Sequence, residues 1–222
     1  MFDHAKLNHI LEDLIVDSRE YGRVYINDKG IEFPSVTTVL SVLENKGLDE
    51  WRKRVGEEEA NRVSKIATVR GEAVHKIFED YLNNDSSYQK GHMPATVSSF
   101  LQLKPTLDQR VNNIHHQEAP LYSKYLKCSG RVDCIAEFDG KLSIIDFKTS
   151  KREKEKSYIS SYFMQTSAYA VMYEERTGIP VSQIVILISV DDGLPQVFIE
   201  KRDDHIKNFM RVRKNFFSKY GV

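Results

Sequence analysis

The sequence predicts an α/β fold in which a mixed central β-sheet is flanked by helices and preceded by a mainly helical N-terminal region. Helical spacing of apolar residues dominates the first half of the chain. The period then changes to that of strands, and three strands, one helix, two strands and one helix follow in that order. At 222 residues we expect one domain, with residues 1–115 forming a helical wall and residues 116–222 forming the catalytic α/β core.

The N-terminal part begins with a small predicted hairpin and continues with helices. The hairpin spans Arg23–Phe33 and turns at Asn27–Gly30, and Ser35 is a plausible N-cap for the next helix. Three longer helical segments follow, the last of them interrupted near Pro105: Leu48–Lys65, Arg70–Asn83 and Pro94–Asn113.

The C-terminal part supplies the sheet. Its first three strands are predicted at Glu118–Leu126, Cys128–Phe138 and Lys141–Phe147, and Asp139-Gly140 is a strong hairpin signal. A long helix at Tyr158–Thr177 is closed by Gly178, with Pro180 just beyond it. Strands at Ser182–Val190 and Gln196–Lys201 precede a basic helix that Asp203 or Asp204 is expected to cap.

Charge and cysteine content limit the function classes. The chain has 32 Lys and Arg against 32 Asp and Glu, so its bulk charge does not argue for nucleic acid, although residues 201–222 carry an excess of basic side chains. A solvated terminal helix is the plainer interpretation of that excess. Cys128 and Cys134 are too few for a four-cysteine site, so we expect reduced core thiols and no iron–sulfur cluster. The sequence lacks a membrane-spanning apolar run and a leader or transit pattern, which favours the cytoplasm.

Two neighbouring strands carry the polar residues of greatest chemical interest. Gly130-Arg-Val-Asp133 lies early in one strand, and Asp146-Phe-Lys148 ends the next. Residues two apart in a strand share a face, so Asp146 and Lys148 point the same way. Two carboxylates and a lysine at one sheet edge are costly to bury without a partner. The pattern predicts a divalent cation there, and an internal Asp–Lys ion pair is the alternative.

The residue types suit phosphoester chemistry. Magnesium prefers oxygen ligands and takes one or two protein carboxylates, which Asp133 and Asp146 can supply. A cation so held polarises a phosphate and lowers the pKa of a bound water. Lys148 beside it can steady the attacking hydroxide or the phosphate charge.

The Gly-Arg-Val-Asp133 and Ile-Ile-Asp146-Phe-Lys148 motifs resemble the PD-(D/E)XK nuclease superfamily, and its RecB-like branch in particular. The resemblance implies a restriction-endonuclease-like core in which Asp133 and Asp146 bind Mg²⁺ or Mn²⁺ and Lys148 assists hydrolysis. It also implies the backbone carbonyl of Phe147 as a metal ligand.

Further positions match the same branch. Gln165-x-x-x-Tyr169 follows the Asp-x-Lys strand, and the resemblance implies that this pair contacts phosphate or orients the lysine, although alone it would be an ordinary amphipathic face. His75 matches an upstream histidine, which implies a catalytic role as metal ligand or phosphate contact. Glu118 is a further candidate in the same branch, and Glu79 is either a site residue or a solvated carboxylate.

An ordered set of N-terminal motifs is similar to one subfamily, the mitochondrial genome maintenance exonucleases and their phage and bacterial relatives. The set comprises Pro34-Ser-Val-Thr37, Trp51 and Arg70-Gly71-x₃-His75. The resemblance implies a metal-dependent deoxyribonuclease that degrades single-stranded ends or flaps in DNA replication, repair or recombination, with a possible protein partner from those processes. The lack of a transit pattern favours a bacterial or phage-infected cell. A structure-specific endonuclease, a duplex-processing exonuclease and a catalytically silent DNA-binding module remain as alternatives.

A single strand is usually held by a positive groove with aromatic platforms. The sequence offers Arg70 and the basic helices around Trp51 on one side, and Lys151 with the charged loop after Asp-x-Lys on the other. Glutamates interrupt that loop, so a mobile solvated segment is an equal interpretation of it.

Overall fold

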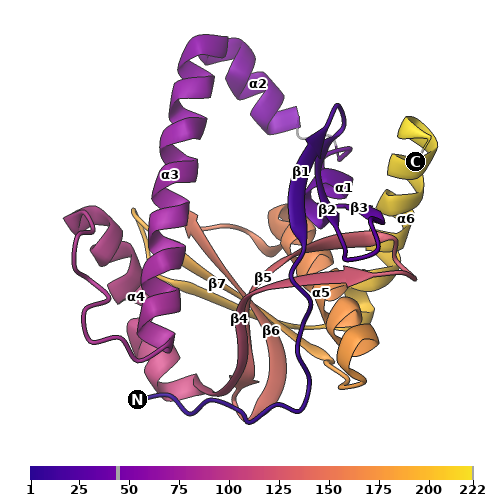
Figure 1. The fold of residues 1–222 in the computed structure, drawn as a ribbon. Coiled ribbons are helices and arrows are strands. Elements are labelled where there is room, and N and C mark those ends of the chain that lie inside the picture. The colour runs from indigo at the N-terminus through magenta and orange to yellow at the C-terminus, as the bar shows by residue number, and fades with distance from the viewer. Residues whose placement is uncertain (44–45, 222) are drawn as a thin grey trace.

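A five-stranded mixed sheet forms the centre of the molecule (Figure 1). The structure is a computed structural model that describes residues 1–43 and 46–221. The strands lie in the order β4-β5-β6-β7-β8. Their bounds are Val111–Ser123, Cys128–Phe138, Lys141–Ser150, Gln183–Val190 and Gln196–Lys201. The predicted α/β class is therefore confirmed.

The sheet contains one parallel pair. Strands β4, β5 and β6 form an antiparallel meander, β6 and β7 run parallel, and β8 returns antiparallel. Asp139 and Gly140, with φ of 53° and 72°, make the tight β5–β6 turn that the sequence predicts. The parallel pair is possible because helix α5, Ser160–Thr177, carries the chain back across the sheet after a short 3-10 turn at Lys156–Ile159.

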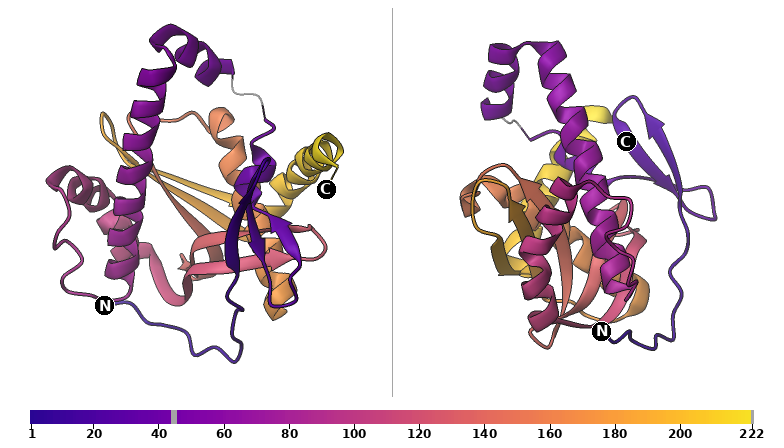
Figure 2. Two further views of the ribbon diagram at one scale, coloured as in Figure 1. Left: turned by 45° about the horizontal axis from the view of Figure 1, so that its top comes forward. Right: turned by 90° about the vertical axis from the view of Figure 1, so that its left-hand side faces the viewer.

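Helices cover both faces of the sheet and divide the core in two (Figures 1 and 2). On one face α5 and α6, Arg202–Tyr220, pack with α1, Val36–Leu40, around fully buried aromatics such as Tyr173 and Phe209. On the other face α3, Glu57–Leu82, and α4, Pro94–Arg110, pack around Phe78 and Phe100. The α3–α4 core lies directly beneath the polar site described below, so α3 is anchored where it carries that site.

The N-terminal part contains more β-structure than the sequence predicts. The expected hairpin is present as β2, Gly22–Ile26, and β3, Glu32–Pro34, and β1, Ile15–Arg19, adds a third strand. Strand β1 was missed because its side chains are mostly exposed and show no alternation. Ser35 caps α1 as predicted, with its hydroxyl accepting a hydrogen bond from the Thr38 amide at 3.0 Å.

The helix boundaries also differ from the prediction. The break lies at Gly56, φ 87°, between α2, Lys46–Val55, and a continuous α3, and not between residues 65 and 70. Helix α4 runs through Pro105 because fully buried Leu103 and Leu107 on either side hold it against the core. It ends at Arg110, so β4 begins seven residues earlier than the predicted Glu118. Asp203 and Asp204 lie in the first turn of α6, whose N-cap is Lys201.

Helices α2 and α3 stand out from the sheet as a hairpin. In Figure 1 α3 rises beside the sheet, and α2 turns back from its far end toward the three-stranded N-terminal sheet. Arg52 of α2 donates a hydrogen bond to Asn61 of α3 at 2.7 Å, which ties the two helices together near the bend. No helix in the described ranges is both long enough and apolar enough to cross a membrane.

Candidate active site

The candidate site begins where β5 and β6 separate. The ladder between these strands ends at the pair Cys134–Ile145, while β5 continues to pair with β4. Beyond that point the side chain of Asp133 replaces the strand partner, because its Oδ2 accepts a hydrogen bond from the Phe147 amide at 2.8 Å. The carboxylate is thereby fixed against the peptide in the middle of the Asp146-Phe147-Lys148 motif.

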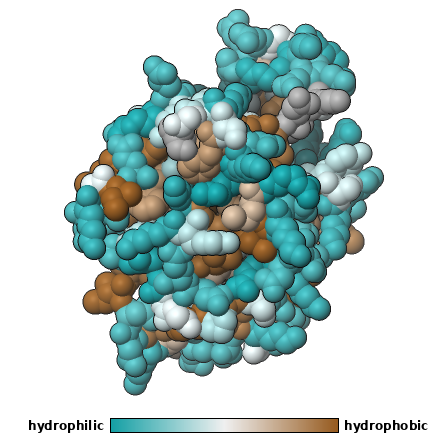
Figure 3. Space-filling model, turned by 90° about the vertical axis from the view of Figure 1, so that its right-hand side faces the viewer, coloured by the Kyte–Doolittle hydropathy of each residue, from teal (hydrophilic) through white to brown (hydrophobic). Residues whose placement is uncertain are grey.

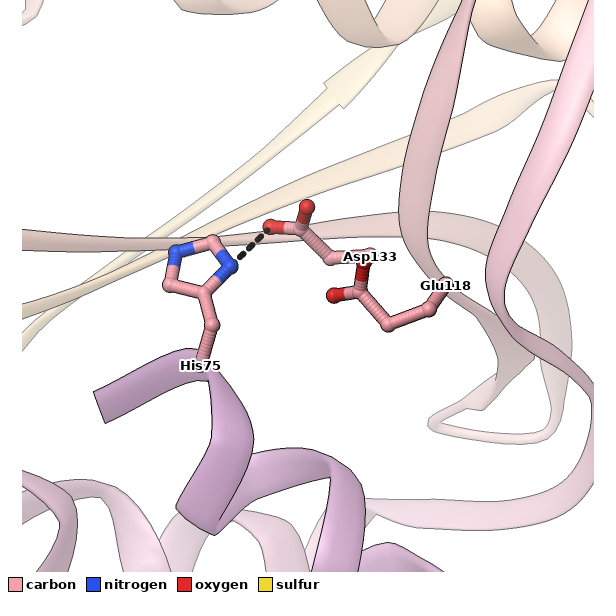
Figure 4. Close-up of side chains that lie close together, drawn as sticks. All are labelled: His75, Glu118 and Asp133. Atoms are coloured by element: carbon pink, nitrogen blue, oxygen red, sulfur yellow. Dashed lines mark ion pairs between the residues drawn. The ribbon is translucent and has the colours of Figure 1, made fainter. Parts of the chain in front are cut away.

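His75 reaches the same residue from helix α3. Its Nε2 lies 2.8 Å from the carbonyl oxygen of Phe147, and its Nδ1 lies 3.5 Å from Oδ2 of Asp133 (Figure 4). Because a carbonyl oxygen only accepts, Nε2 carries a hydrogen, and Nδ1 is turned toward the carboxylate. The ring is therefore placed by the backbone of Phe147 and faces Asp133.

Glu118 completes a three-residue cluster. One ligand atom from each of His75, Glu118 and Asp133 lies within 4.8 Å of the other two, and Figure 4 shows the three side chains turned toward one another. Glu118 has a positive φ of 46°, and the β4–β5 register places it opposite Asp133, between the pairs Gln117–Cys134 and Ala119–Val132. Burial, and then the charge of Asp133, raises the pKa of Glu118 to about 7.

Asp146 and Lys148 lie deeper in the sheet and form an ion pair. Asp146 is only 1% exposed, and apart from the Lys148 ammonium its carboxylate oxygens have no hydrogen-bond donor within the part of the chain that the structure describes. Burial raises the pKa of Asp146 despite the neighbouring lysine. The ammonium of Lys148 also lies 5.2 Å from the centre of the Tyr162 ring, a cation–π arrangement that fixes the lysine side chain.

This donor set fits a hard divalent cation. Buried carboxylate oxygens with a single ammonium as their only donor are under-satisfied, and a cation would complete their contacts. The cluster offers two carboxylates and one imidazole within mutual reach. The carboxylates suit a hard divalent cation, and the imidazole adds a softer nitrogen donor. Asp146 lies outside the three-residue cluster, and the Phe147 carbonyl, also expected to be a ligand, is contacted by His75. The ligand roles of both stay predictions.

A pocket opens over the cluster. It has a volume of about 540 Å³ and is lined by residues of α3, β4 and β5: Gly71, Glu72, His75, Lys76, Glu79, Glu118 and Arg131. Arg131 was missed by the sequence reasoning, although it stands inside the Gly-Arg-Val-Asp motif. It projects from β5 on the exposed side, and its guanidinium donates to the backbone carbonyl of Glu118. That contact holds the Glu118 backbone in the conformation that the cluster needs.

Gln165 and Tyr169 lie on α5 behind the strand that bears Asp133. The two side chains touch, with Gln165 Nε2 donating to the Tyr169 hydroxyl at 3.3 Å. Tyr169 is only 3% exposed, and burial raises its pKa strongly. Its ring lies against Gly130, where an added Cβ would stand 2.6 Å from the ring. The tyrosine therefore supports the backbone of β5, and a direct substrate contact stays a prediction.

The other two predicted substrate residues lie apart from the cluster. Arg70, one turn before His75 on α3, forms an ion pair with Asp191 and donates a hydrogen bond to Ser99 at 2.6 Å. Lys151 is exposed at the end of β6. The backbone of Lys154, in the charged loop that follows Lys151, exchanges hydrogen bonds with the Gln196 side chain at 2.8 and 3.0 Å. The substrate contact and the alternative of a mobile solvated loop both stay predictions.

Comparison with known proteins supplies the family. Residues 87–212 match the model of the PD-(D/E)XK nuclease superfamily, a span that covers more than half of the chain and includes Asp133, Asp146 and Lys148. His75 precedes this span.

Two curated relatives are mitochondrial genome maintenance exonuclease 1 from Homo sapiens and from Mus musculus. Each is 27% identical over 175 residues, which is 73% of this chain. The chain spans about half the length of these relatives, 50% of the human and 51% of the mouse protein. A solved structure of a putative exonuclease from Eubacterium rectale overlaps 68% of each chain at 13% identity with a TM-score of 0.38, and the crystal structure titled SSO0001 overlaps at a TM-score of 0.40. Neither overlap is close enough to add to the assignment. Its match to the family model and its Asp133, Asp146 and Lys148 motif place the chain in the PD-(D/E)XK nuclease superfamily.

Proposed function

We propose that this protein is a magnesium- or manganese-dependent deoxyribonuclease that removes nucleotides from single-stranded DNA ends or flaps. The observation that carries the proposal is the cluster of His75, Glu118 and Asp133 directly beside the buried Asp146–Lys148 pair, under a pocket that is open to solvent. The family match supports nuclease chemistry, and the names of the curated relatives support an exonuclease.

The cation would be held by four side chains: His75, Glu118, Asp133 and Asp146. The Phe147 carbonyl would be a further ligand if His75 gives up its hydrogen bond to that carbonyl. When bound, a divalent cation supplies positive charge that polarises the phosphodiester and lowers the pKa of a water ligand. Asp146 holds the ammonium of Lys148 at the base of the site. From there the ammonium would donate hydrogen bonds to the attacking water or to a phosphate oxygen.

The buried Asp146 argues against a silent DNA-binding module. A carboxylate that is 1% exposed and has only the Lys148 ammonium as its donor within the described chain costs desolvation free energy that such an ion pair often fails to repay. Apolar residues in place of both members of the pair would serve stability as well or better. The cost is consistent with a site that binds a cation.

The proposal also includes how the DNA strand enters the site and the cellular process in which the enzyme acts. Helices α2 and α3 rise over the pocket side of the sheet (Figure 2), which is consistent with a strand that enters from a free end. We place the activity in DNA replication, repair or recombination. The compartment stays open in this proposal, because the curated relatives are mitochondrial by name and do not support the bacterial or phage cytoplasm expected from the sequence.

Digestion of three substrates tests the proposal. An end-labelled linear single strand, a circular single strand and a blunt duplex are each incubated with the protein in Mg²⁺, Mn²⁺ or EDTA. We expect metal-dependent loss of the linear strand, with the circle and the duplex spared. Cutting of the circle would establish an endonuclease instead. Loss of the duplex would establish a duplex-processing exonuclease, and binding without cleavage in either metal would establish a silent module.

A further inference from the structure

A second pocket, lined by basic residues, lies between helix α6 and the turn that joins β4 to β5. It has a volume of about 510 Å³ and is lined by Lys127, Met210, Arg213, Lys214, Phe217 and Ser218. None of these residues lines the candidate active site. Figure 3 views the molecule from the side on which α6 lies, where hydrophilic side chains predominate and hydrophobic atoms show between them.

The three cations of this pocket have no carboxylate partner within residues 1–43 and 46–221. This contrasts with many other cations of the chain, since Arg70 pairs with Asp191 and Lys156 pairs with Glu200 at 2.5 Å. The lysine that lines the active-site pocket is also paired, because Nζ of Lys76 lies 2.8 Å from Oδ1 of Asp80. Three like charges around one hollow repel each other unless an anion occupies it. The pocket is therefore suited to an anionic ligand.

The fold fixes the guanidinium of Arg213 and the backbone of Lys127. Arg213 donates through Nε to the carbonyl of Leu126, its side chain also contacts the Cys128 thiol, and its guanidinium lies 4.6 Å from the centre of the Phe217 ring. No carboxylate in the described chain pairs with this guanidinium. Lys127 holds a left-handed backbone with φ 48° at the end of the turn, so the turn sets the point from which its exposed side chain leaves the backbone. A preformed group of donors loses little entropy when it binds an anion.

An exposed aromatic side chain stands beside the cations. Tyr125 occupies the same β4–β5 turn and is 71% exposed, and it lines a neighbouring groove that shares Met210 with the basic pocket. That groove also holds three carboxylates, and each is already engaged: Arg202 pairs with Glu174 and Asp203, and Glu175 accepts hydrogen bonds from the Ser123 hydroxyl and the Lys124 amide. Lys124 adds a further exposed cation to the turn. Positive side chains that follow a phosphate backbone, next to an aromatic face on which a base can stack, are the usual elements of single-strand binding.

We propose that Lys127, Arg213 and Lys214 form a second phosphate-binding site for single-stranded nucleic acid, with Tyr125 as a stacking platform, outside the active site. The proposal deepens the proposed function, on which it rests, because it gives the substrate strand a second point of attachment. The site contributes to binding of long strands and takes no part in bond cleavage.

The test compares two double variants of the full chain. Lys127→Gln with Lys214→Gln removes two pocket charges and leaves Arg213, which supports the turn. Lys90→Gln with Lys141→Gln removes the same charge from two exposed lysines elsewhere, one in the turn before α4 and one at the start of β6. Fluorescence anisotropy in EDTA measures the binding of a labelled strand of about forty nucleotides and of one of about six nucleotides, so that no result depends on cleavage.

We expect the pocket variant to bind the long strand at least about five-fold more weakly than the control variant, and the short strand equally well. The slope of log affinity against log salt should fall by about 1.4, which is about 0.7 for each lost phosphate contact. Tyr125→Ala should weaken binding of the long strand and have a smaller effect on an abasic strand of the same length. In a separate nuclease assay, KM for the long strand should rise while kcat stays unchanged.

Equal affinities and equal salt slopes for the two double variants would overturn the second site, whether or not the protein is a nuclease. Failure of the wild type to bind any single strand would also overturn it. If the pocket variant loses affinity for polyglutamate and not for DNA, the site takes an acidic protein and the proposal is wrong. If the wild type binds DNA through the pocket but cleaves none in either metal, the second site stands and the proposed function fails.

Discussion

The carboxylate of Asp133 caps the backbone of Phe147, because its Oδ2 accepts the Phe147 N–H at 2.8 Å at the point where β5 and β6 part. Asp133 thus fixes the backbone position of Phe147, the middle residue of the Asp146-Phe147-Lys148 motif. The same residue is held at its carbonyl by His75, whose Nε2 lies 2.8 Å from the Phe147 oxygen. Strand β5 and helix α3 are both joined to β6 through the backbone of Phe147, so the geometry of the cluster depends on Asp133, His75 and Phe147.

Asp133→Asn separates charge from structure at this point. The asparagine oxygen can still accept the Phe147 N–H, so the melting temperature should change little, whereas the loss of charge should lower the cleavage rate about a hundred-fold or more. Cleavage of a labelled strand and thermal melting measure the two effects. Asp28→Asn, in the exposed β2–β3 turn, is the matched control. A variant that cleaves at the wild-type rate would remove Asp133 from the site.

The Asp146–Lys148 pair should be required for activity and not for stability. Lys148→Met leaves a buried carboxylate without its partner, which we expect to cost about 3 kcal/mol of unfolding free energy. The double variant Asp146→Asn with Lys148→Met removes both charges and should regain most of that loss while remaining inactive. Urea unfolding and cleavage assays measure both properties. A double variant less stable than Lys148→Met alone would show that the pair stabilises the fold.

Gly130→Ala tests the support that Tyr169 gives to β5. The added Cβ would lie 2.6 Å from Cε1 and 2.7 Å from the hydroxyl of Tyr169, in a place with no free volume. We expect a loss of about 1–3 kcal/mol of stability. Gly71→Ala is the opposite control, because nothing lies within 4 Å of the Cβ that it adds. The free energy of unfolding should rise by about 0.5–1 kcal/mol, since alanine favours the helix more than glycine does. Equal effects of the two substitutions in urea unfolding would contradict the packing argument.

The Arg70–Asp191 pair should stabilise the protein in a pH-dependent way. Hydrogen bonding from Arg70 lowers the pKa of Asp191 below its usual value of 3.8. A carboxyl with a lowered folded-state pKa contributes stability that is present above its unfolded-state pKa and is lost as the pH falls through the folded value.

Asp191→Asn should therefore be about 1 kcal/mol less stable than wild type at neutral pH, and the difference should vanish as the pH falls through about 4 and below. Melting temperatures of both proteins across this range measure the difference, since other titrating groups act equally on both. A difference that stays constant down to the acid limit would mean that Asp191 acts through packing and not through its charge.

The sequence predicted the C-terminal sheet better than the N-terminal part. Turn residues such as Asp139-Gly140 and the stop signal at Gly178 act locally, and both lie where expected. Tertiary packing overrode local signals elsewhere, as in α4, where buried leucines carry the helix through Pro105. Strand β1 gave no periodic signal because its exposed side chains meet no core.

Sequence motifs identified Asp133, Asp146, Lys148 and His75, and the structure brings these residues together at one place. The importance of Glu118 was less evident, because its place depends on the pairing of β4 with β5 and on a positive φ that no short pattern encodes. The role of Arg131 was not found, because it depends on a contact with the backbone carbonyl of Glu118 on the neighbouring strand. The sequence showed the basic excess of residues 201–222 but not the pocket, which also needs Lys127 from the β4–β5 turn.

The central claim is that the cluster beside Asp146 and Lys148 is a metal-dependent nuclease site. The most direct measurement follows an end-labelled linear single strand through three steps with one protein sample: Mg²⁺ present, EDTA in excess, and Mg²⁺ restored. Wild-type protein should degrade the strand, stop and resume, while the Asp133→Asn variant should leave it intact at every step. Degradation that continues in EDTA, or an Asp133→Asn variant that keeps pace with wild type, would contradict the account.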